Sequence, residues 1–96
     1  PGKHERFDVM ELVRDCVADF AVRPEHARAD LGLSGPDRLS CHADRNAIQS
    51  ILENLIDNAL RYGGPQVRVD IDVAAVGSSI RLQVADDGPG IPEAQR

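Results

Sequence analysis

Two asparagines, Asn54 and Asn58, lie four residues apart in a segment whose apolar residues repeat at helical spacing. On a helix they differ by about 40° and lie one turn apart on the same side, bordering the apolar stripe, and Arg61 continues their line. Asparagine is a mediocre helix former, so helix propensity does not explain the pair. Two amide oxygens so placed could share a hard cation such as Mg²⁺, and a guanidinium could meet a phosphate. The alternative is a polar helix edge with solvated amides.

A second candidate is a carboxylate at the end of a predicted strand. Asp86 has the parity of the apolar residues within 80–84, so we expect its side chain to point into the buried layer. A carboxylate there costs free energy unless the protein or a ligand donates a hydrogen bond to it. Two glycines follow, Gly88 and Gly90, which would let the backbone approach a ligand. The alternative is an ordinary turn in which backbone amides bind a buried Asp.

A long helix must carry the asparagine line. Apolar spacing predicts this helix from Arg45 to about Tyr62, with Asp44 as its N-cap and residues 63–65 (GGP) as its end. The residues that we expect in its apolar stripe are Ile48, Ile51, Leu52, Leu55, Ile56 and Ala59.

Alternating apolar residues over 67–73 and 80–84, with a turn at 77–79, predict a hairpin with one buried face. Upstream, a short strand at residues 7–9 leads into a helix from Met10 to near Arg23. The segment 28–42 contains alternating residues, a turn and a second candidate strand. The two helices must cover the buried hairpin face, so we predict a two-layer α+β sandwich.

Composition limits the classes of protein to consider. A chain of 96 residues and 10.4 kDa has room for one core, so we predict a single domain over residues 1–96. No apolar run approaches the roughly 20 residues that span a bilayer. The formal net charge of −5 argues against general nucleic-acid binding, which needs a surplus of Lys and Arg.

Two of these segments resemble motifs of one family. Residues 54–63 (NLIDNALRYG) resemble the N box of bacterial sensor histidine kinases, and residues 84–92 (VADDGPGIP) resemble their G1 box. The 27 residues between Asn58 and Asp86 fit the hairpin that separates the two boxes. The resemblance to the ATP-binding domain of these kinases covers essentially the whole chain.

The resemblance implies a fold and a site for metal and phosphate. The family has a Bergerat-type sandwich, in which a mixed sheet is packed against helices and ATP lies between the helices and a lid. Asn58 would bind Mg²⁺, Asn54 would lie at the ion or the phosphates, and Arg61 would reach a phosphate. Asn54 and Asn58 would be the catalytic and metal-binding residues, and Arg61 would belong to the ATP-binding residues.

The adenine side of the site is implied in the same way. Asp86 would accept a hydrogen bond from the adenine amino group, which would explain a buried carboxylate. Tyr62 would line the adenine side, Gly88 and Gly90 would let the backbone pass close to the base, and Ile91 would pack near it.

The function implied is transfer of the γ-phosphoryl group of Mg-ATP to a histidine on a separate dimerisation hairpin. In two-component signalling, a response regulator would then receive this group. The F and G2 boxes that form the lid, the last elements of the sandwich and the histidine hairpin are expected outside this chain, so the piece alone should be inactive. The parent is expected to be a homodimer in the bacterial cell membrane, with this domain in the cytoplasm.

Related ATPases of the superfamily carry a catalytic Glu four residues before the metal-binding Asn. That position is Asn54 here, while Glu53 is about 100° around the helix and is expected to face solvent. A kinase is therefore favoured over a hydrolytic ATPase. Two alternatives stay open: an anti-sigma-factor-type Ser/Thr kinase of the same superfamily, and an interaction module that keeps the fold without catalysis.

Overall fold

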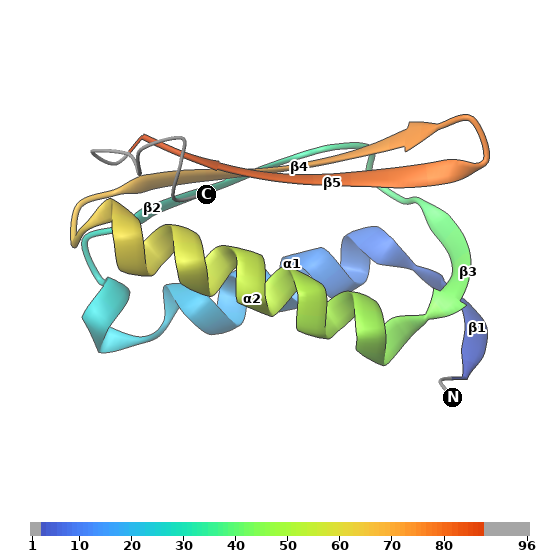
Figure 1. Ribbon diagram of the computed structural model, residues 1–96, viewed down its shortest axis with the longest axis horizontal. Coiled ribbons are helices and arrows are strands. Elements are labelled where there is room, and N and C mark those ends of the chain that lie inside the picture. Colours follow the sequence, from blue (N-terminus) through green and yellow to red (C-terminus); the bar gives the residue numbers. More distant parts are fainter. Residues whose placement is uncertain (1–2, 88–96) are drawn as a thin grey trace, which may run out of the picture.

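The structure, a computed structural model, describes residues 3–87. Two helices lie on one face of a three-stranded sheet, and a two-stranded sheet lies at the end of the molecule nearer the N-terminus (Figure 1). In chain order the elements are β1 (His4–Asp8), α1 (Val9–Ala21), the 3-10 turn η1 (Pro24–His26), β2 (Asp30–Ser34), β3 (Ser40–Asp44), α2 (Arg45–Gly63), β4 (Arg68–Val76) and β5 (Ser79–Asp86).

The larger sheet is mixed and has the order β2-β4-β5. β2 runs parallel to β4, with Asp30 opposite Arg68, whereas β4 and β5 form the predicted antiparallel hairpin. The two-layer α+β architecture with a mixed sheet is therefore confirmed. The antiparallel pairing of β1 with β3 is an addition that the sequence did not predict.

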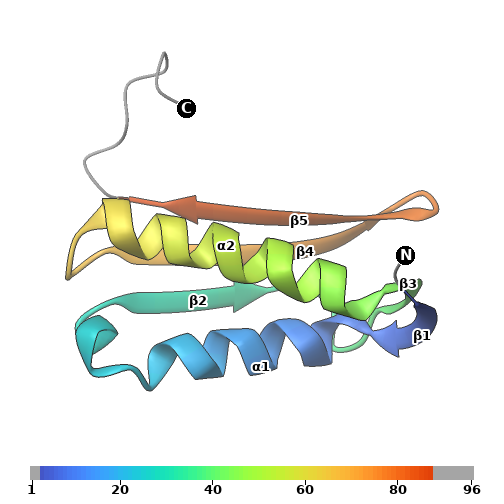
Figure 2. The ribbon, with the colours of Figure 1, turned by 60° about the horizontal axis from the view of Figure 1, so that its bottom comes forward.

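The hydrophobic core lies between the helices and the sheet. β4 is the central strand, and its helix-facing side chains Val69, Ile71 and Val73 are at most 2% exposed. α1 lies under β2 and α2 lies under β4 and β5 (Figure 2). The core residues of the two helices are Val9, Met10, Leu12, Val13, Cys16 and Phe20 from α1, and Leu52, Ile56, Ala59 and Leu60 from α2.

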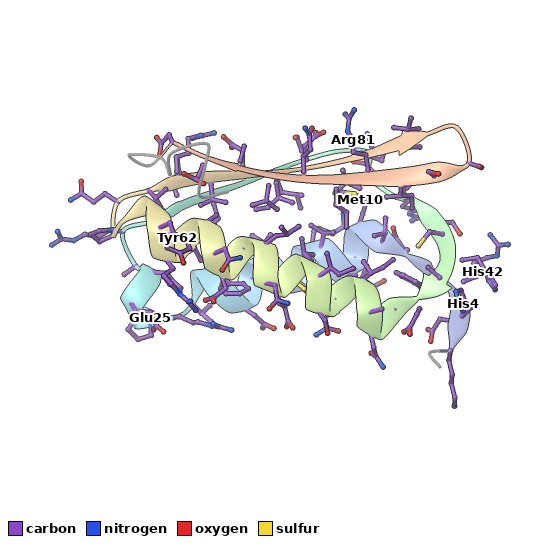
Figure 3. All side chains as sticks on the ribbon, viewed as in Figure 1. His4, Met10, Glu25, His42, Tyr62 and Arg81 are labelled. Carbon is purple, nitrogen blue, oxygen red and sulfur yellow. The ribbon has the colours of Figure 1, made fainter. Side chains whose placement is uncertain are left out.

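The opposite face of the sheet is polar, as the alternation in the hairpin predicts. Arg68 forms an ion pair with Asp30 across the parallel strands at 2.8 Å. Arg81, which points away from the helices in Figure 3, lies 3.6 Å from Asp72 across the hairpin. These pairs are exposed, so each contributes little to stability.

Both ends of α2 agree with the sequence. The Asp44 carboxylate accepts hydrogen bonds from the backbone N–H groups of Asn46 and Ala47, which confirms the predicted N-cap. The helix ends at Gly63, where an added Cβ would collide with the buried side chain of Val67, and Gly64 then takes a φ of +91°. Glycine tolerates both conditions, so the chain can turn sharply from α2 into β4.

The predicted apolar stripe of α2 was wrong at two positions. Leu52 and Ile56 are fully buried, but Ile51 is 55% exposed and Leu55 is 39% exposed. These two residues lie about 80–120° around the helix from the centre of the buried face, where no described segment covers them.

In the described part of the chain, neither helix combines the length and the apolar character needed to cross a lipid bilayer.

Candidate functional site

The two described segments that carry predicted site residues, α2 and β5, end on the same side of the molecule. α2 ends and β5 ends at the same side in both ribbon views, opposite the β1–β3 sheet (Figures 1 and 2). Tyr62 lies on the last turn of α2, far from His4 and His42 at the other end (Figure 3). The structure therefore brings together two segments that are separated by the whole β4–β5 hairpin.

Asn54, Asn58 and Arg61 are all exposed on α2. With Leu52 and Ile56 in the core, the asparagine line lies opposite the buried face of the helix instead of at its border. The difference from the prediction has the same cause as the exposure of Ile51 and Leu55. A ligand can therefore reach all three polar side chains.

The two flanks of this line face different neighbours. Burial is the main cause that raises the pKa of the Cys16 thiol on α1, and the negative charge of Glu53 adds to it. Glu53 therefore lies on the flank of α2 near α1. The other flank faces the β5 side and carries Tyr62, which is 56% exposed, together with exposed Ile51 and Leu55. An aromatic and apolar surface thus adjoins the asparagine line on its β5 side.

Arg61 does not extend freely into solvent. Its Nη2 donates to Oδ2 of Asp57 at 2.7 Å, in an i, i+4 ion pair on the surface of α2. This contact was not predicted, although the i, i+4 spacing of Asp57 and Arg61 is the signal for it.

Asp86 has the predicted orientation but not the predicted burial. It lies opposite Val69 in the antiparallel register, so both side chains are on the helix-facing side of the sheet. Asp86 is nevertheless exposed, because β5 is an outer strand in the described part of the sheet and Asp86 is its last residue. The expectation of a buried carboxylate was therefore wrong.

Asp87 fixes the end of β5, a role that was not predicted from the sequence. Its backbone N–H donates to the Arg68 carbonyl at 3.1 Å, and its carboxylate accepts from the Arg68 N–H at 2.8 Å. These bonds hold the chain directly after Asp86 against the start of β4. The predicted site residues Gly88, Gly90 and Ile91 lie outside the described residues.

The donor set fits a magnesium–phosphate ligand better than a bare metal ion. Mg²⁺ takes oxygen ligands and is usually held by one or two carboxylates together with substrate phosphates. Asn54 and Asn58 offer neutral amide oxygens, and the residues 3–87 contain no group of three or more His, Cys, Asp or Glu side chains that could hold a metal. Phosphate oxygens would therefore have to supply most of the negative charge around the ion.

The chain is similar in sequence to a known family and to a sensor protein. Residues 43–96 match the family described as histidine kinase-, DNA gyrase B- and HSP90-like ATPase. The chain is 32% identical over 99 residues to the swarming motility regulation sensor protein RssA of Serratia marcescens, and it spans 21% of that protein.

The fold is also that of a solved kinase domain. The catalytic domain of histidine kinase ThkA superposes with a TM-score of 0.87 at 27% identity, over 96% of this chain and 64% of that one. ThkA in complex with the response regulator protein TrrA matches with a TM-score of 0.84, over 96% of this chain and 28% of that one. The chain therefore belongs to the family of histidine kinase-, DNA gyrase B- and HSP90-like ATPases.

Proposed function

We propose that this chain is part of the ATP-binding domain of a sensor histidine kinase. It would bind Mg-ATP and present the γ-phosphoryl group to a histidine on a separate dimerisation hairpin. The observation that supports the proposal is that α2, which carries the exposed side chains Asn54, Asn58 and Arg61, ends on the same side of the molecule as β5, whose last residue is Asp86. The β4–β5 hairpin separates the ends of α2 and β5 along the chain, so their placement on one side is a property of the fold.

The chemistry of each group supports its proposed role. The amide oxygens of Asn58 and Asn54 would hold Mg²⁺ and the phosphates, and the Arg61 guanidinium would bind a phosphate oxygen. Bound Mg²⁺ would neutralise charge on the phosphates during transfer. Asp86 would accept from the adenine amino group, and Tyr62 on the β5 flank would line the base.

These residues favour positioning of Mg-ATP for phosphoryl transfer over ATP hydrolysis. Asn54 occupies the place where related ATPases carry a catalytic Glu, and an amide cannot act as a general base. Glu53 was expected to face solvent but is half-buried, and it accepts a hydrogen bond from Gln49 at 3.4 Å on the α1 side of the helix. Its place on that flank is unsuited to activating a water at Asn58.

A solved relative supports one partner for the whole protein. The ThkA complex contains a response regulator, so we propose that such a protein receives the phosphoryl group here too. A membrane-bound, homodimeric parent with this domain in the cytoplasm stays a prediction.

Replacement of Asn58 tests the proposal. In the full-length protein that carries this chain, we expect Asn58→Ala to abolish the Mg²⁺ dependence of ATP binding and nearly all histidine phosphorylation. Adenosine binding should change much less, because the amide acts on metal and phosphates and not on the base. Calorimetric titrations with ATP and adenosine, with and without Mg²⁺, and radiolabelled autophosphorylation measure these effects.

Asn46→Ala is the matched control. Asn46 is also an exposed asparagine of α2 but lies in its first turn, about 18 Å along the helix from Asn58. It should leave ATP binding and phosphorylation unchanged. Full autophosphorylation in Asn58→Ala would refute the metal assignment, and a wild-type protein that binds no nucleotide would favour a non-catalytic interaction module.

A further inference from the structure

We propose that Asp57 competes with the nucleotide phosphates for Arg61, and so sets how strongly the site favours a triphosphate over the bare nucleoside. This inference rests on the proposed function. Asp57 would be a positioning residue, because it would act on the ligand only through the guanidinium that it holds.

The contact that carries the inference is the ion pair on α2. Nη2 of Arg61 lies 2.7 Å from Oδ2 of Asp57, and Asp57 is the one ion-pair partner of Arg61 among residues 3–87. The side chains are 63% and 41% exposed, so water can replace either partner without leaving a buried charge. The pair can therefore open when a stronger anion approaches.

The position of Asp57 gives the direction of the effect. On a helix, Asp57 lies about 40° from Arg61 toward the flank that holds Glu53 and faces α1. Tyr62 lies on the other side of Arg61, toward β5 and Asp86. Asn54 and Asn58, where the phosphates are proposed to lie, are also on that other side of Arg61, so Asp57 draws the guanidinium away from them and its carboxylate opposes phosphate binding.

The size of the effect follows from the exposure of the pair. Exposed i, i+4 pairs shift an equilibrium by about twofold, and removal of a negative charge beside the phosphates adds to this. We expect Asp57→Asn to tighten Mg-ATP binding by about 2–5-fold, with a smaller gain for ADP. Adenosine affinity should not change, because adenosine has no phosphate for Arg61 to bind.

A double-mutant cycle in the full-length protein tests the inference. ATP, ADP and adenosine affinities are measured by calorimetry for the wild type, Asp57→Asn, Arg61→Ala and the double variant, at low and high salt. The gain from Asp57→Asn should vanish in the Arg61→Ala background and shrink at high salt. Glu53→Gln, which removes the same charge from α2 without a contact to Arg61, should give no comparable gain.

Three outcomes would overturn the inference: unchanged ATP affinity in Asp57→Asn, weaker ATP binding in that variant, or a gain that persists without Arg61. Weaker binding would mean that Asp57 orients Arg61 for the phosphate. Failure of the proposed function would differ, because Asn58→Ala and Arg61→Ala would then leave ATP binding intact. Thermal melting of each variant confirms that these exposed substitutions do not alter folding.

Discussion

The proposed role of Asp86 in adenine recognition depends on the charge of its carboxylate as well as on its oxygen atoms. In Asp86→Asn the amide offers a weaker acceptor, or a donor, to the adenine amino group. We expect the variant to fold and to lose about 1.5–3 kcal/mol of nucleotide binding, the usual value of a hydrogen bond to a charged group. ATP, ADP and adenosine should all bind about 10–150-fold more weakly in calorimetric titrations of the full-length protein.

Asp87→Asn is the control for this charge change. An asparagine oxygen can still accept the hydrogen bond from the Arg68 N–H, so this variant should keep its affinity for nucleotide. GTP should bind poorly to the wild type, because guanine has a carbonyl where adenine has the amino group. Unchanged ATP and ADP affinity in Asp86→Asn would show that the carboxylate does not recognise adenine.

At the residue scale, the sequence predicted orientation better than exposure. The parity of Asp86 follows from its own strand and is correct, whereas its burial depends on which segments cover the end of β5. Ile51 and Leu55 were misjudged for the same reason, since helical spacing does not say how wide the covered face is. The pairing of Asp57 with Arg61 could have been predicted, because it depends only on local spacing.

At the scale of elements, one carboxylate joins three segments at the β1–α1 junction. Oδ1 of Asp8 accepts from the Met10 N–H at 3.0 Å, as the N-cap of α1, and from the Leu39 N–H at 2.9 Å, next to β3. Arg14 lies 3.8 Å from Oδ2 of Asp8. The hydrogen bond from Leu39 is the main cause that lowers the pKa of Asp8, with further contributions from Met10 and Arg14, while burial opposes them.

This lowered pKa predicts a pH dependence of stability. A carboxyl whose folded-state pKa is depressed stabilises the fold above its unfolded pKa, about 3.9 here, and loses that contribution as the pH falls through the folded value. We expect Asp8→Asn, which keeps an N-cap acceptor, to flatten the loss of stability below about pH 4. Thermal melting between pH 7 and the acid limit should show the two proteins converging as the pH falls.

Asp15→Asn is the control, because it removes the same charge from an exposed position of α1. It should follow the wild type in its acid dependence. A pH profile of Asp8→Asn identical to that of the wild type would show that the Asp8 carboxylate does not contribute to stability through its charge.

The helices and the hairpin were predicted because their signals are local. Caps, apolar periodicity and the glycines after α2 lie within the elements themselves. The β1–β3 pairing and the parallel pairing of β2 with β4 join segments far apart in the chain. The sequence of a strand does not identify the strand with which it pairs. The mixed sheet could therefore be predicted only from the resemblance to the kinase family.

At the scale of the whole molecule, one flank is apolar and open in the described part of the chain. It consists of the exposed Ile51 and Leu55 of α2 and the half-buried Ile80, Leu82 and Val84 of β5, an outer strand. Such a surface invites association. We expect the 96-residue chain alone to dimerise or aggregate. It should bind nucleotide weakly, because its proposed phosphate site lies on an exposed helix face, and it should catalyse nothing.

Light scattering with mass spectrometry of the intact chain tests this expectation. Ile51→Gln combined with Leu55→Gln should reduce association without loss of the core, while Ser50→Gln, at an exposed polar position of the same helix, should not. A strictly monomeric chain that binds ATP at micromolar strength would contradict the prediction.

The parallel pairing of β2 with β4 also has a consequence for synthesis of the chain. Asp30 is paired with Arg68, 38 residues later, so β2 leaves the ribosome well before its partner exists. At 5–20 residues per second this delay is about 2–8 s, far longer than a helix or a hairpin needs to form. During this interval the apolar faces of α1 and β2 are not yet covered by the rest of the fold. A nascent chain of this fold therefore most needs a chaperone at this stage.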